Sequence, residues 1–328
     1  MKVLITREIP RSGTDILNDA GLELDYRKGP PLTDSELKLA IKDVDAILPV
    51  IPDIITKEVI DAAGENLKII AAYSVGYDHI NVKHATQKGI YVANTPGDKT
   101  VKSVAEHALA LMLSLGTKLV DSDQFCRDGK YKYWDPMGFL GTRMVGKTLG
   151  IIGFGRIGKS LARMAHGLDM KILYNNIERC ELEEKELGAK CVDVEELLQK
   201  SDFVSLHVDL NETTRHLISE QQFHLMKPEA ILINTARGPV INEEALVKAL
   251  KAGIIQGAGL DVFEHEPEIH QELLKIPNVI LTPHIASGTR EVRIQMANLA
   301  AQNIVDVLVD NKAPTHLVNK EIVAKILL

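Results

Sequence analysis

The sequence predicts an α/β fold made of two doubly wound parallel-sheet domains, and three observations support this prediction. Short apolar runs alternate with helical patterns as far as about residue 99. The same alternation returns from residue 148, and it opens on the glycine-rich segment 153–158. Strands that alternate with helices form parallel sheets covered on both faces. A chain of 328 residues is long enough for about two such domains.

The first series contains one well-marked helix start and five expected strands. Thr33 stands three residues before Glu36, which is the spacing of a capping box, and Leu37 and Ile41 follow with helical periodicity. The expected strands are residues 3–6, 22–26, 46–50, 69–73 and 90–94.

The second series resembles a complete dinucleotide-binding sheet, because it contains six expected strands with helices between them. Long helical patterns also cover 101–119, between the two series, and 291–309 near the end. We therefore expect a Rossmann cofactor domain, 100–292, inserted into a flavodoxin-like substrate domain formed by 1–99 and 293–328, with one cleft. The six expected strands are residues 149–152, 171–174, 203–207, 231–234, 258–261 and 279–282.

Composition excludes several classes of protein. The net charge is −7, and charges of both signs are scattered along the chain, which argues against nucleic acid or an anionic membrane as the main partner. No apolar stretch approaches the length of about 18 residues that a membrane span needs. The three cysteines form no close motif, and their odd number argues against a disulfide framework. We therefore expect a cytoplasmic protein.

The glycine segment has the context of a dinucleotide fingerprint, with an apolar run before it and a helical pattern after it. Gly153 would permit the tight turn, Gly155 would let a pyrophosphate approach the backbone, and Gly158 would allow close helix–strand packing. The pyrophosphate would then meet unpaired N–H groups at the positive end of the helix.

Three residues stand directly after expected strands of the second series, where ligands of open parallel sheets bind. Arg237 follows the strand 231–234, Glu266 follows 258–261, and His284 follows 279–282. Taken singly, each has an ordinary alternative: a surface ion pair for Arg237, a solvated loop residue for Glu266, and a turn cap for His284. Together they offer a cation that could bind the carboxylate of a ligand and a histidine that could donate a proton near neutral pH.

Four segments resemble the signature blocks of the D-isomer-specific 2-hydroxyacid dehydrogenase family, and they occur in the family's order. The resemblance implies an NAD(P)H-dependent oxidoreductase that reduces a small 2-keto acid to the D-2-hydroxy acid and catalyses the reverse oxidation. The residues Phe139 to Gly141 look most like those of glyoxylate and hydroxypyruvate reductases. The four segments are 148–158, 234–238, 260–267 and 282–288.

The resemblance also implies catalytic and substrate-binding roles. His284 would donate the proton, Glu266 would orient and charge its imidazole, and Arg237 would bind the substrate's carboxylate and carbonyl oxygens. The loop after the strand 69–73 resembles the family loop whose backbone N–H groups hold the substrate carboxylate. Val75 and Gly76 are the matching residues there.

The same matching assigns the cofactor site. Asp261 would contact the nicotinamide carboxamide, and Arg156 and Ile157 would offer backbone N–H groups to the pyrophosphate. Val104 would lie near the nicotinamide. The full set of expected cofactor residues is Val104, Gly153, Gly155, Arg156, Ile157, Gly158, Asn176, Arg179, Thr235, Ala236 and Asp261.

One position departs from the fingerprint and decides which dinucleotide we expect. The acidic residue that binds an adenosine ribose stands about 20 residues after the glycines, and Asn176 occupies that place. Arg179 lies close enough in sequence to pair with a 2′-phosphate, although Glu178 beside it opposes this. We therefore expect NADP(H) in preference to NAD(H). The remaining histidines, His107 among them, show no ligand spacing, so no metal is expected.

The segment 134–140 carries Trp134, Met137, Phe139 and Leu140. It would form a subunit contact of a homodimer and part of the substrate-pocket wall, or else a local hydrophobic plug. Within the family, a D-3-phosphoglycerate or D-lactate type dehydrogenase is the alternative. Formate and phosphite dehydrogenases are disfavoured, since they carry glutamine and lysine where this chain has Glu266 and Val75. An NAD(H)-sensing binding protein of the corepressor type is the alternative outside enzymes.

Overall fold

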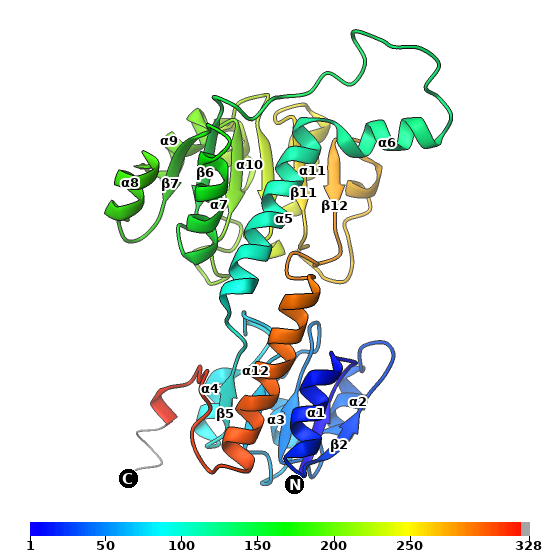
Figure 1. Cartoon of the computed structure of the whole chain (residues 1–328), viewed down its shortest axis with the longest axis vertical. Helices are drawn as coiled ribbons and strands as arrows, with labels where there is room; N and C mark the ends of the chain where they lie inside the picture. Colours follow the sequence, from blue (N-terminus) through cyan, green and yellow to red (C-terminus); the bar gives the residue numbers. More distant parts are fainter. Residues whose placement is uncertain (323–328) are drawn as a thin grey trace. The chain divides into compact units, whose positions relative to one another are not determined.

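The computed structural model describes residues 1–322 and divides the chain into two compact units (Figure 1). The first unit comprises Met1–Thr100 and the chain from Gly288 onward, and the second comprises Val101–Ser287. The second unit is thus an insertion into the first. Each unit contains a parallel sheet with helices on both faces, which confirms the predicted fold class.

The sheet of the first unit has five parallel strands in the order β2-β1-β3-β4-β5, the doubly wound order of flavodoxin-like folds. All five predicted strands are confirmed. They are β1 (Lys2–Ile5), β2 (Glu23–Tyr26), β3 (Ala46–Leu48), β4 (Ile69–Ala71) and β5 (Tyr91–Ala93).

Strand residues of this sheet alternate between two hydrophobic cores. Val3 and Ile5 pack with α1 (Arg11–Asp19) and α12 (Arg290–Leu308), whereas Leu4 packs on the opposite face with α2, α3 and α4. The capping box of Thr33 and Glu36 is present at the start of α2. The helices on that second face are α2 (Asp34–Ala40), α3 (Lys57–Ala62) and α4 (Val82–Gln87).

The sheet of the second unit has seven parallel strands in the order β12-β11-β10-β9-β6-β7-β8. Six of them match the predicted strands, so the prediction of six is corrected to seven. The additional strand, β8 (Lys190–Cys191), has two exposed residues at the sheet edge, and its sequence lacks the apolar pattern of a strand. The others are β6 (Thr148–Ile152), β7 (Lys171–Asn175), β9 (Phe203–Leu206), β10 (Ile231–Asn234), β11 (Gly257–Leu260) and β12 (Val279–Leu281).

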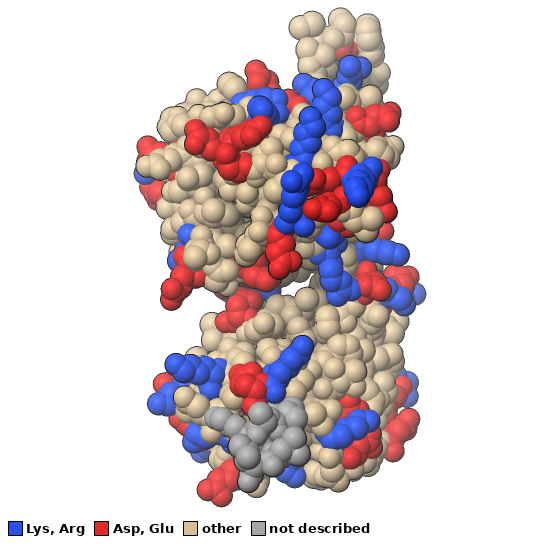
Figure 2. All heavy atoms as spheres, turned by 90° about the vertical axis from the view of Figure 1, so that its left-hand side faces the viewer, with Lys and Arg blue, Asp and Glu red and all other residues tan. Residues whose placement is uncertain are grey.

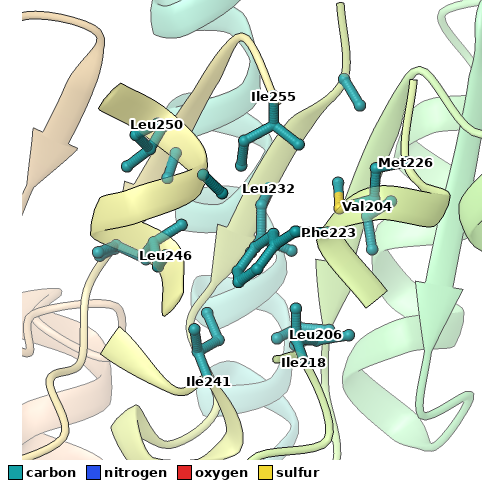
Figure 3. Packing of buried hydrophobic residues seen from close by; sticks show 14 of the residues in the cluster. Val204, Leu206, Ile218, Phe223, Met226, Leu232, Ile241, Leu246, Leu250 and Ile255 are labelled. Atoms are coloured by element: carbon teal, nitrogen blue, oxygen red, sulfur yellow. The ribbon is translucent and has the colours of Figure 1, made fainter. Parts of the chain in front are cut away.

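Helices cover both faces of this sheet. On one face, α5 (Asp98–Gly116) and α7 (Arg156–His166) pack against Leu149 and Ile151 of β6. On the other face, three helices enclose a core around Phe223 and Leu232 (Figure 3). These are α9 (Val194–Lys200), α10 (Glu220–Leu225) and α11 (Glu243–Lys251). The remaining helical segments are α6 (Leu119–Arg127), α8 (Glu181–Leu187), η1 (Gly238–Val240) and η2 (Leu273–Lys275).

Two expectations about the long helices need adjustment. The helix predicted over 101–119 runs from Asp98 to Gly116, and Lys118 adopts a left-handed φ of 57° that separates it from α6. The helix predicted over 291–309 is α12, one residue earlier at each end. None of the helices within residues 1–322 has both the length and the apolar run that crossing a bilayer requires.

Charged side chains of both signs lie intermixed on each unit over the face shown in Figure 2. Ion pairs along helices join several charged side chains of the protein, such as Lys38 with Asp34 and Lys200 with Glu196. This face therefore presents no broad area of a single sign to a polyanionic partner.

Gly13 in α1 packs directly on α12, so its replacement by valine should destabilise the first unit. A Cβ at this position would lie 2.9 Å from the Cβ of Ala297. Overpacking of this kind costs about 1–3 kcal/mol, and the Gly13→Val variant should lose that much unfolding free energy in urea titrations followed by circular dichroism. Asn18→Val, at an exposed position of the same helix, is the control. Equal stability of the two variants would contradict close α1–α12 packing.

Candidate active site

The glycine segment forms a tight turn between β6 and α7. Gly153 adopts a left-handed φ of 92°, and a Cβ there would lie 2.5 Å from the carbonyl oxygen of His207. A Cβ on Gly158 would lie 2.4 Å from the carbonyl oxygen of Gly153, so helix and strand meet through these two glycines. A Cβ on Gly155, in contrast, would have nothing within 4 Å. The turn is therefore closed on the sheet side and open at Gly155.

The N-terminus of α7 suits an anionic ligand. Gly155 is its N-cap and supplies no side-chain cap, so the first N–H groups, at Arg156 and Ile157, point along the positive end of the helix dipole. Near the end of β10, the hydroxyl of Thr235 is buried and has no hydrogen-bond partner among the described residues. A helix start whose N-cap has no side chain, an open glycine and an unpaired hydroxyl fit a bound dinucleotide.

Asp261, at the end of β11, organises the loop after the neighbouring strand β12. Its fully buried carboxylate accepts hydrogen bonds from Thr282 Oγ1 at 2.6 Å and from the backbone N–H groups of Ile285 and Ala286, both at 2.8 Å. His107 of α5 lies 3.4 Å away and also contacts Thr282. Burial alone would raise the pKa of Asp261, but these hydrogen bonds outweigh it and lower that pKa.

His107 is a site residue that the sequence interpretation passed over. It has no ligand spacing with any acidic residue, and its partner Asp261 is far away in the sequence. Its position on the face of α5 that meets the sheet is the only local signal that could have indicated a role.

His284 is held by both its backbone and its side chain. It adopts a left-handed φ of 53°, and its N–H donates to the carbonyl oxygens of Asp261 and Thr282. Its Nδ1 lies 2.8 Å from Glu266 Oε2, while Glu266 Oε1 accepts from the N–H of Phe263 at 3.1 Å. A strained backbone conformation in a non-glycine residue persists only where the surroundings fix it. The structure thus brings two of the three predicted catalytic side chains into direct contact.

Arg237 lies on the loop after β10, next to the loop that carries Glu266. The carboxamide of Asn234, which is buried, braces this loop by donating to the carbonyl oxygen of Arg237 and accepting from the N–H of Ala236. A Cβ on Gly238 would lie 1.8 Å from the carbonyl oxygen of Phe263. The Arg237 loop and the Phe263–Glu266 segment are therefore in backbone contact.

Two glutamates fasten the same loops together, and the sequence interpretation did not single them out. Glu264 accepts from the N–H of Glu243 at 3.1 Å and from His216 Nε2 at 2.5 Å, and Glu243 accepts from the N–H of Glu264 at 2.7 Å. Burial raises the pKa of Glu243. Burial also acts on Glu264, but hydrogen bonds from His216 and Glu243 lower its pKa. This reciprocal pair links the start of α11 to the loop of Glu266.

The residues expected at the adenosine ribose occupy the turn after β7. Asn176 Oδ1 accepts from the N–H of Phe154, in the glycine turn, and Asn176 Nδ2 donates to the carbonyl oxygen of Glu178. Arg179 forms a bidentate ion pair with Glu184 of α8. The structure thus places Asn176 beside the glycine turn and engages Arg179 with a carboxylate.

The remaining predicted residues lie elsewhere. Val75 and Gly76 follow β4 in the first unit, where Asn94 Nδ2 donates to the carbonyl oxygen of Val75 and Ser74 Oγ to that of Gly76. Val104 is buried in α5. Among residues 1–322, no group of three or more histidine, cysteine, aspartate or glutamate side chains is placed to hold a metal ion.

Replacing Asp261 by asparagine should destabilise the second unit, because an amide cannot accept from all of these donors. The loss at pH 7 should be about 1–3 kcal/mol of unfolding free energy. Because folding lowers the pKa of Asp261, its carboxylate contributes fully to the unfolding free energy above the ordinary pKa of about 3.9. This contribution disappears as the pH falls through the lower pKa of the folded state. Urea titrations at pH 7 and pH 3 should show the difference narrowing in acid. A difference that is constant with pH would contradict the network.

Several known proteins are similar to this chain over nearly its whole length. The family model described as D-isomer specific 2-hydroxyacid dehydrogenase, NAD binding domain, matches residues 109–286. A glyoxylate reductase of Thermococcus litoralis is 47% identical over 326 residues, which cover 98% of this chain and 97% of that protein. Among solved structures, the TT0316 protein from Thermus thermophilus has a TM-score of 0.91 at 38% identity and covers 97% of this chain and 100% of its own. A glyoxylate reductase from Paecilomyes thermophila has a TM-score of 0.85 at 32% identity, and the match covers 98% of this chain and 99% of that protein. The chain therefore belongs to the D-isomer-specific 2-hydroxyacid dehydrogenase family of NAD-binding oxidoreductases.

Proposed function

We propose that this protein uses NAD(P)H to reduce a small 2-keto acid, glyoxylate or hydroxypyruvate, to the D-2-hydroxy acid, and that it catalyses the reverse oxidation. The observation that carries the proposal is the contact of His284 with Glu266. These two residues lie on loops that follow strands β11 and β12, in the unit that also contains the open glycine turn. A proton donor and a dinucleotide site on one sheet are the two requirements of keto-acid reduction.

His284 acts as the general acid. A carboxylate can only accept, so Nδ1 carries the hydrogen in its contact with Glu266, and Nε2 is left to hold the transferable proton. Reduction needs an imidazole that carries a proton on Nε2, and the carboxylate of Glu266 orients the ring for this by accepting the Nδ1 hydrogen. Nε2 gives its proton to the carbonyl oxygen of the substrate as the C=O double bond becomes a single bond.

Arg237 binds the substrate through its guanidinium fork, which suits a planar carboxylate and the neighbouring carbonyl oxygen. Val75 and Gly76, on the loop after β4, remain the residues of the first unit that are predicted to bind a substrate carboxylate through backbone N–H groups. When bound, the dihydronicotinamide supplies a hydride to the keto carbon. Substrate orientation by Arg237 and proton donation by His284 then complete the new C–H and O–H bonds without a metal.

In this proposal residues 100–292 form the domain that holds the dinucleotide, and the flanking segments, 1–99 and 293 onward, form the substrate domain. Arg156 and Ile157 bind the pyrophosphate, and Thr235 and Ala236 line the cofactor. The sequence alone favours NADP(H), because Arg179 could pair with a 2′-phosphate, but in the structure this guanidinium is paired with Glu184. Asp261 remains the residue predicted to contact the nicotinamide carboxamide. Its carboxylate already accepts hydrogen bonds from Thr282, Ile285 and Ala286, so we propose that its larger role is to position the loop of His284.

Glyoxylate and hydroxypyruvate are favoured over other 2-keto acids because the similar protein from Thermococcus litoralis, which this chain matches over nearly its whole length, is a glyoxylate reductase. D-3-Phosphoglycerate and D-lactate type activities remain the alternatives within the family. A nucleotide-sensing binding protein is the alternative outside it, and turnover separates it from an enzyme.

A spectrophotometric screen of glyoxylate, hydroxypyruvate, phosphohydroxypyruvate and pyruvate, each with NADH and NADPH, tests the proposal. Glyoxylate or hydroxypyruvate should give the highest kcat/KM. His284→Ala should lower kcat at least about 100-fold, the usual scale of general-acid catalysis, while the dinucleotide dissociation constant stays within about threefold. His224→Ala, at an exposed position of α10, is the matched control. Dinucleotide binding without turnover of any keto acid would favour the sensing protein.

We also propose that the protein is a homodimer, and the segment that follows α6 supports this. Its large apolar side chains are exposed, with Trp134 exposed by 77%, and α6 and this segment extend away from the sheet of the second unit (Figure 1). Exposed apolar groups of this size mark interaction surfaces, and their exposure argues against a local hydrophobic plug. The exposed apolar residues are Leu119, Val120, Tyr131, Tyr133, Trp134, Met137, Phe139, Leu140 and Val145.

Replacing Trp134 by alanine should weaken the dimer, because a buried tryptophan at an interface contributes about 2 kcal/mol or more. The dimer dissociation constant should rise at least about tenfold, as measured by sedimentation velocity over a range of concentrations. Leu39→Ala removes an equally exposed apolar side chain from α2 of the first unit and should have no effect. A wild-type protein that is monomeric at all concentrations would refute the homodimer.

A further inference from the structure

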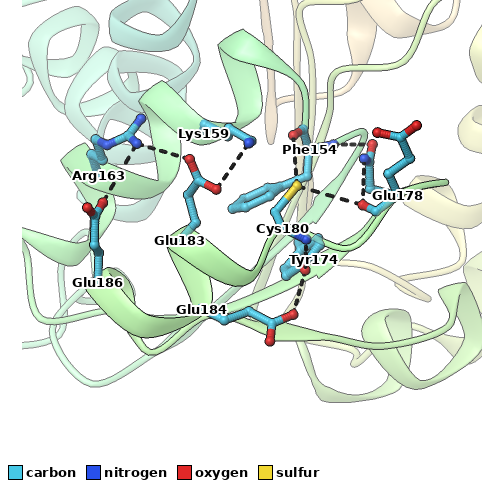
Figure 4. Close-up of polar contacts among 10 residues, drawn as sticks. Phe154, Lys159, Arg163, Tyr174, Glu178, Cys180, Glu183, Glu184 and Glu186 are labelled. Atoms are coloured by element: carbon cyan, nitrogen blue, oxygen red, sulfur yellow. Dashed lines mark hydrogen bonds and ion pairs between the residues drawn. The ribbon is translucent and has the colours of Figure 1, made fainter.

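Glutamates of α8, the helix that follows the turn after β7, form ion pairs with cations close to the glycine turn, and Figure 4 shows the pair of Lys159 with Glu183. Two cations border this region, Lys159 in the first turns of α7 and Arg179 in the turn itself. Each is paired with a glutamate of α8: Lys159 Nζ lies 3.0 Å from Glu183 Oε2, and Arg179 Nη2 lies 2.8 Å from Glu184 Oε2. Lys159 and Arg179 therefore each already have a carboxylate partner.

Glu184 is fixed in place by groups other than Arg179. Tyr174 Oη donates to Glu184 Oε1 at 2.6 Å and accepts from the N–H of Cys180 at 2.8 Å. The ring of Tyr174 is buried and stacks on Phe154 of the glycine turn, with ring centroids 4.1 Å apart. The side chain of Glu184 is only 16% exposed. Its carboxylate is therefore anchored to the same core that shapes the nucleotide turn.

Arg179 is the more exposed partner of this pair, with 69% of its side chain accessible. Hydrogen bonds from Arg179 and then from Tyr174 lower the pKa of Glu184 to about 2, so the carboxylate is ionised at any physiological pH. A 2′-phosphate that drew Arg179 away would leave this ionised carboxylate without its cation and facing a second anion. Like charges at short range oppose binding.

The neighbouring charges act in the same direction. Glu178 precedes Arg179, and the first turn of α8 carries Glu181, Glu183 and Glu184. Asn176, whose side chain is held by Phe154 and Glu178, adds no positive charge. Acidic groups therefore outnumber basic ones around the expected ribose position.

We propose that Glu184 determines the dinucleotide preference of this protein and that it selects NADH by holding Arg179 in an ion pair where a 2′-phosphate would need it. The proposal rests on the proposed function of the glycine turn. It reverses the preference expected from the sequence, because the sequence alone does not show that Arg179 already has a partner.

The test is the Glu184→Gln variant, whose amide oxygen can still accept from Tyr174 while its charge is removed. Titrations of the full-length protein with NADH and NADPH, followed by the fluorescence of the reduced nicotinamide, give both dissociation constants. The wild-type protein should bind NADH at least tenfold more tightly. In Glu184→Gln the affinity for NADPH should increase about tenfold or more, while that for NADH changes less than threefold.

Two further variants separate this explanation from a general loss of negative charge. Glu186→Gln removes a charge from the same helix, where Glu186 lies 3.9 Å from Arg163, and should change neither constant. Adding Arg179→Ala to Glu184→Gln should abolish the gain in NADPH affinity, because the released guanidinium is its source. Tyr174→Phe, which keeps the ring and loosens Glu184, should give a smaller gain and serves if Glu184→Gln folds poorly.

Three results would overturn the proposal: a wild-type preference for NADPH, an unchanged NADPH affinity in Glu184→Gln, or a reduced one. A reduced affinity would mean that Glu184 positions Arg179 for the phosphate. If the wild-type protein bound neither dinucleotide, the proposed function itself would fail, and the inference with it.

Discussion

The buried carboxylate of Asp261 receives hydrogen bonds from the hydroxyl of Thr282 and from two consecutive N–H groups, at Ile285 and Ala286. His107 reaches the same carboxylate from α5. An ionised group without solvent is costly unless its lone pairs are satisfied, and here the donors come from the loop that must be held. The left-handed backbone of His284 lies within this arrangement, because Thr282 and Ile285 on either side both hydrogen-bond to Asp261, whose carbonyl oxygen also accepts from the N–H of His284.

Three adjacent strands, β10, β11 and β12, deliver the three catalytic candidates to one edge of the sheet. Adjacency alone would leave their loops free to move. Asn234, Gly238 and the pair of Glu243 with Glu264 remove that freedom through side-chain bonds to backbone and through direct backbone contact. The direct contact of His284 with Glu266 is therefore supported by groups that take no part in the proposed chemistry.

At the glycine turn of the same sheet, a buried aromatic side chain makes the main connection. Tyr174 links the glycine turn, through its stacking on Phe154, to the carboxylate of Glu184. A core aromatic residue thus couples the shape of the turn to the charge that faces the ribose. The proposed selection between NADH and NADPH depends on this one anchored carboxylate rather than on the residue that ends β7.

The sequence by itself determined the features that follow from local periodicity and spacing. The five strands of the first sheet, six of the second, the capping box at Thr33 and the strand–turn–helix context of Gly153 were all predictable, because strands, caps and glycine turns are set by residues close together in the chain. The positions of Arg237, Glu266 and His284 after strands followed from the general rule for parallel sheets. Only the tertiary structure decided the pairing of Arg179 with Glu184, the role of His107 at Asp261, the short edge strand β8 and the exposure of Trp134. His107 meets Asp261 because α5 packs on the sheet, a contact that the neighbours of either residue in sequence do not encode. Arg179 and Glu184 are only five residues apart, but their pairing depends on the conformation of the turn after β7 and on the anchoring of Glu184 by the buried Tyr174.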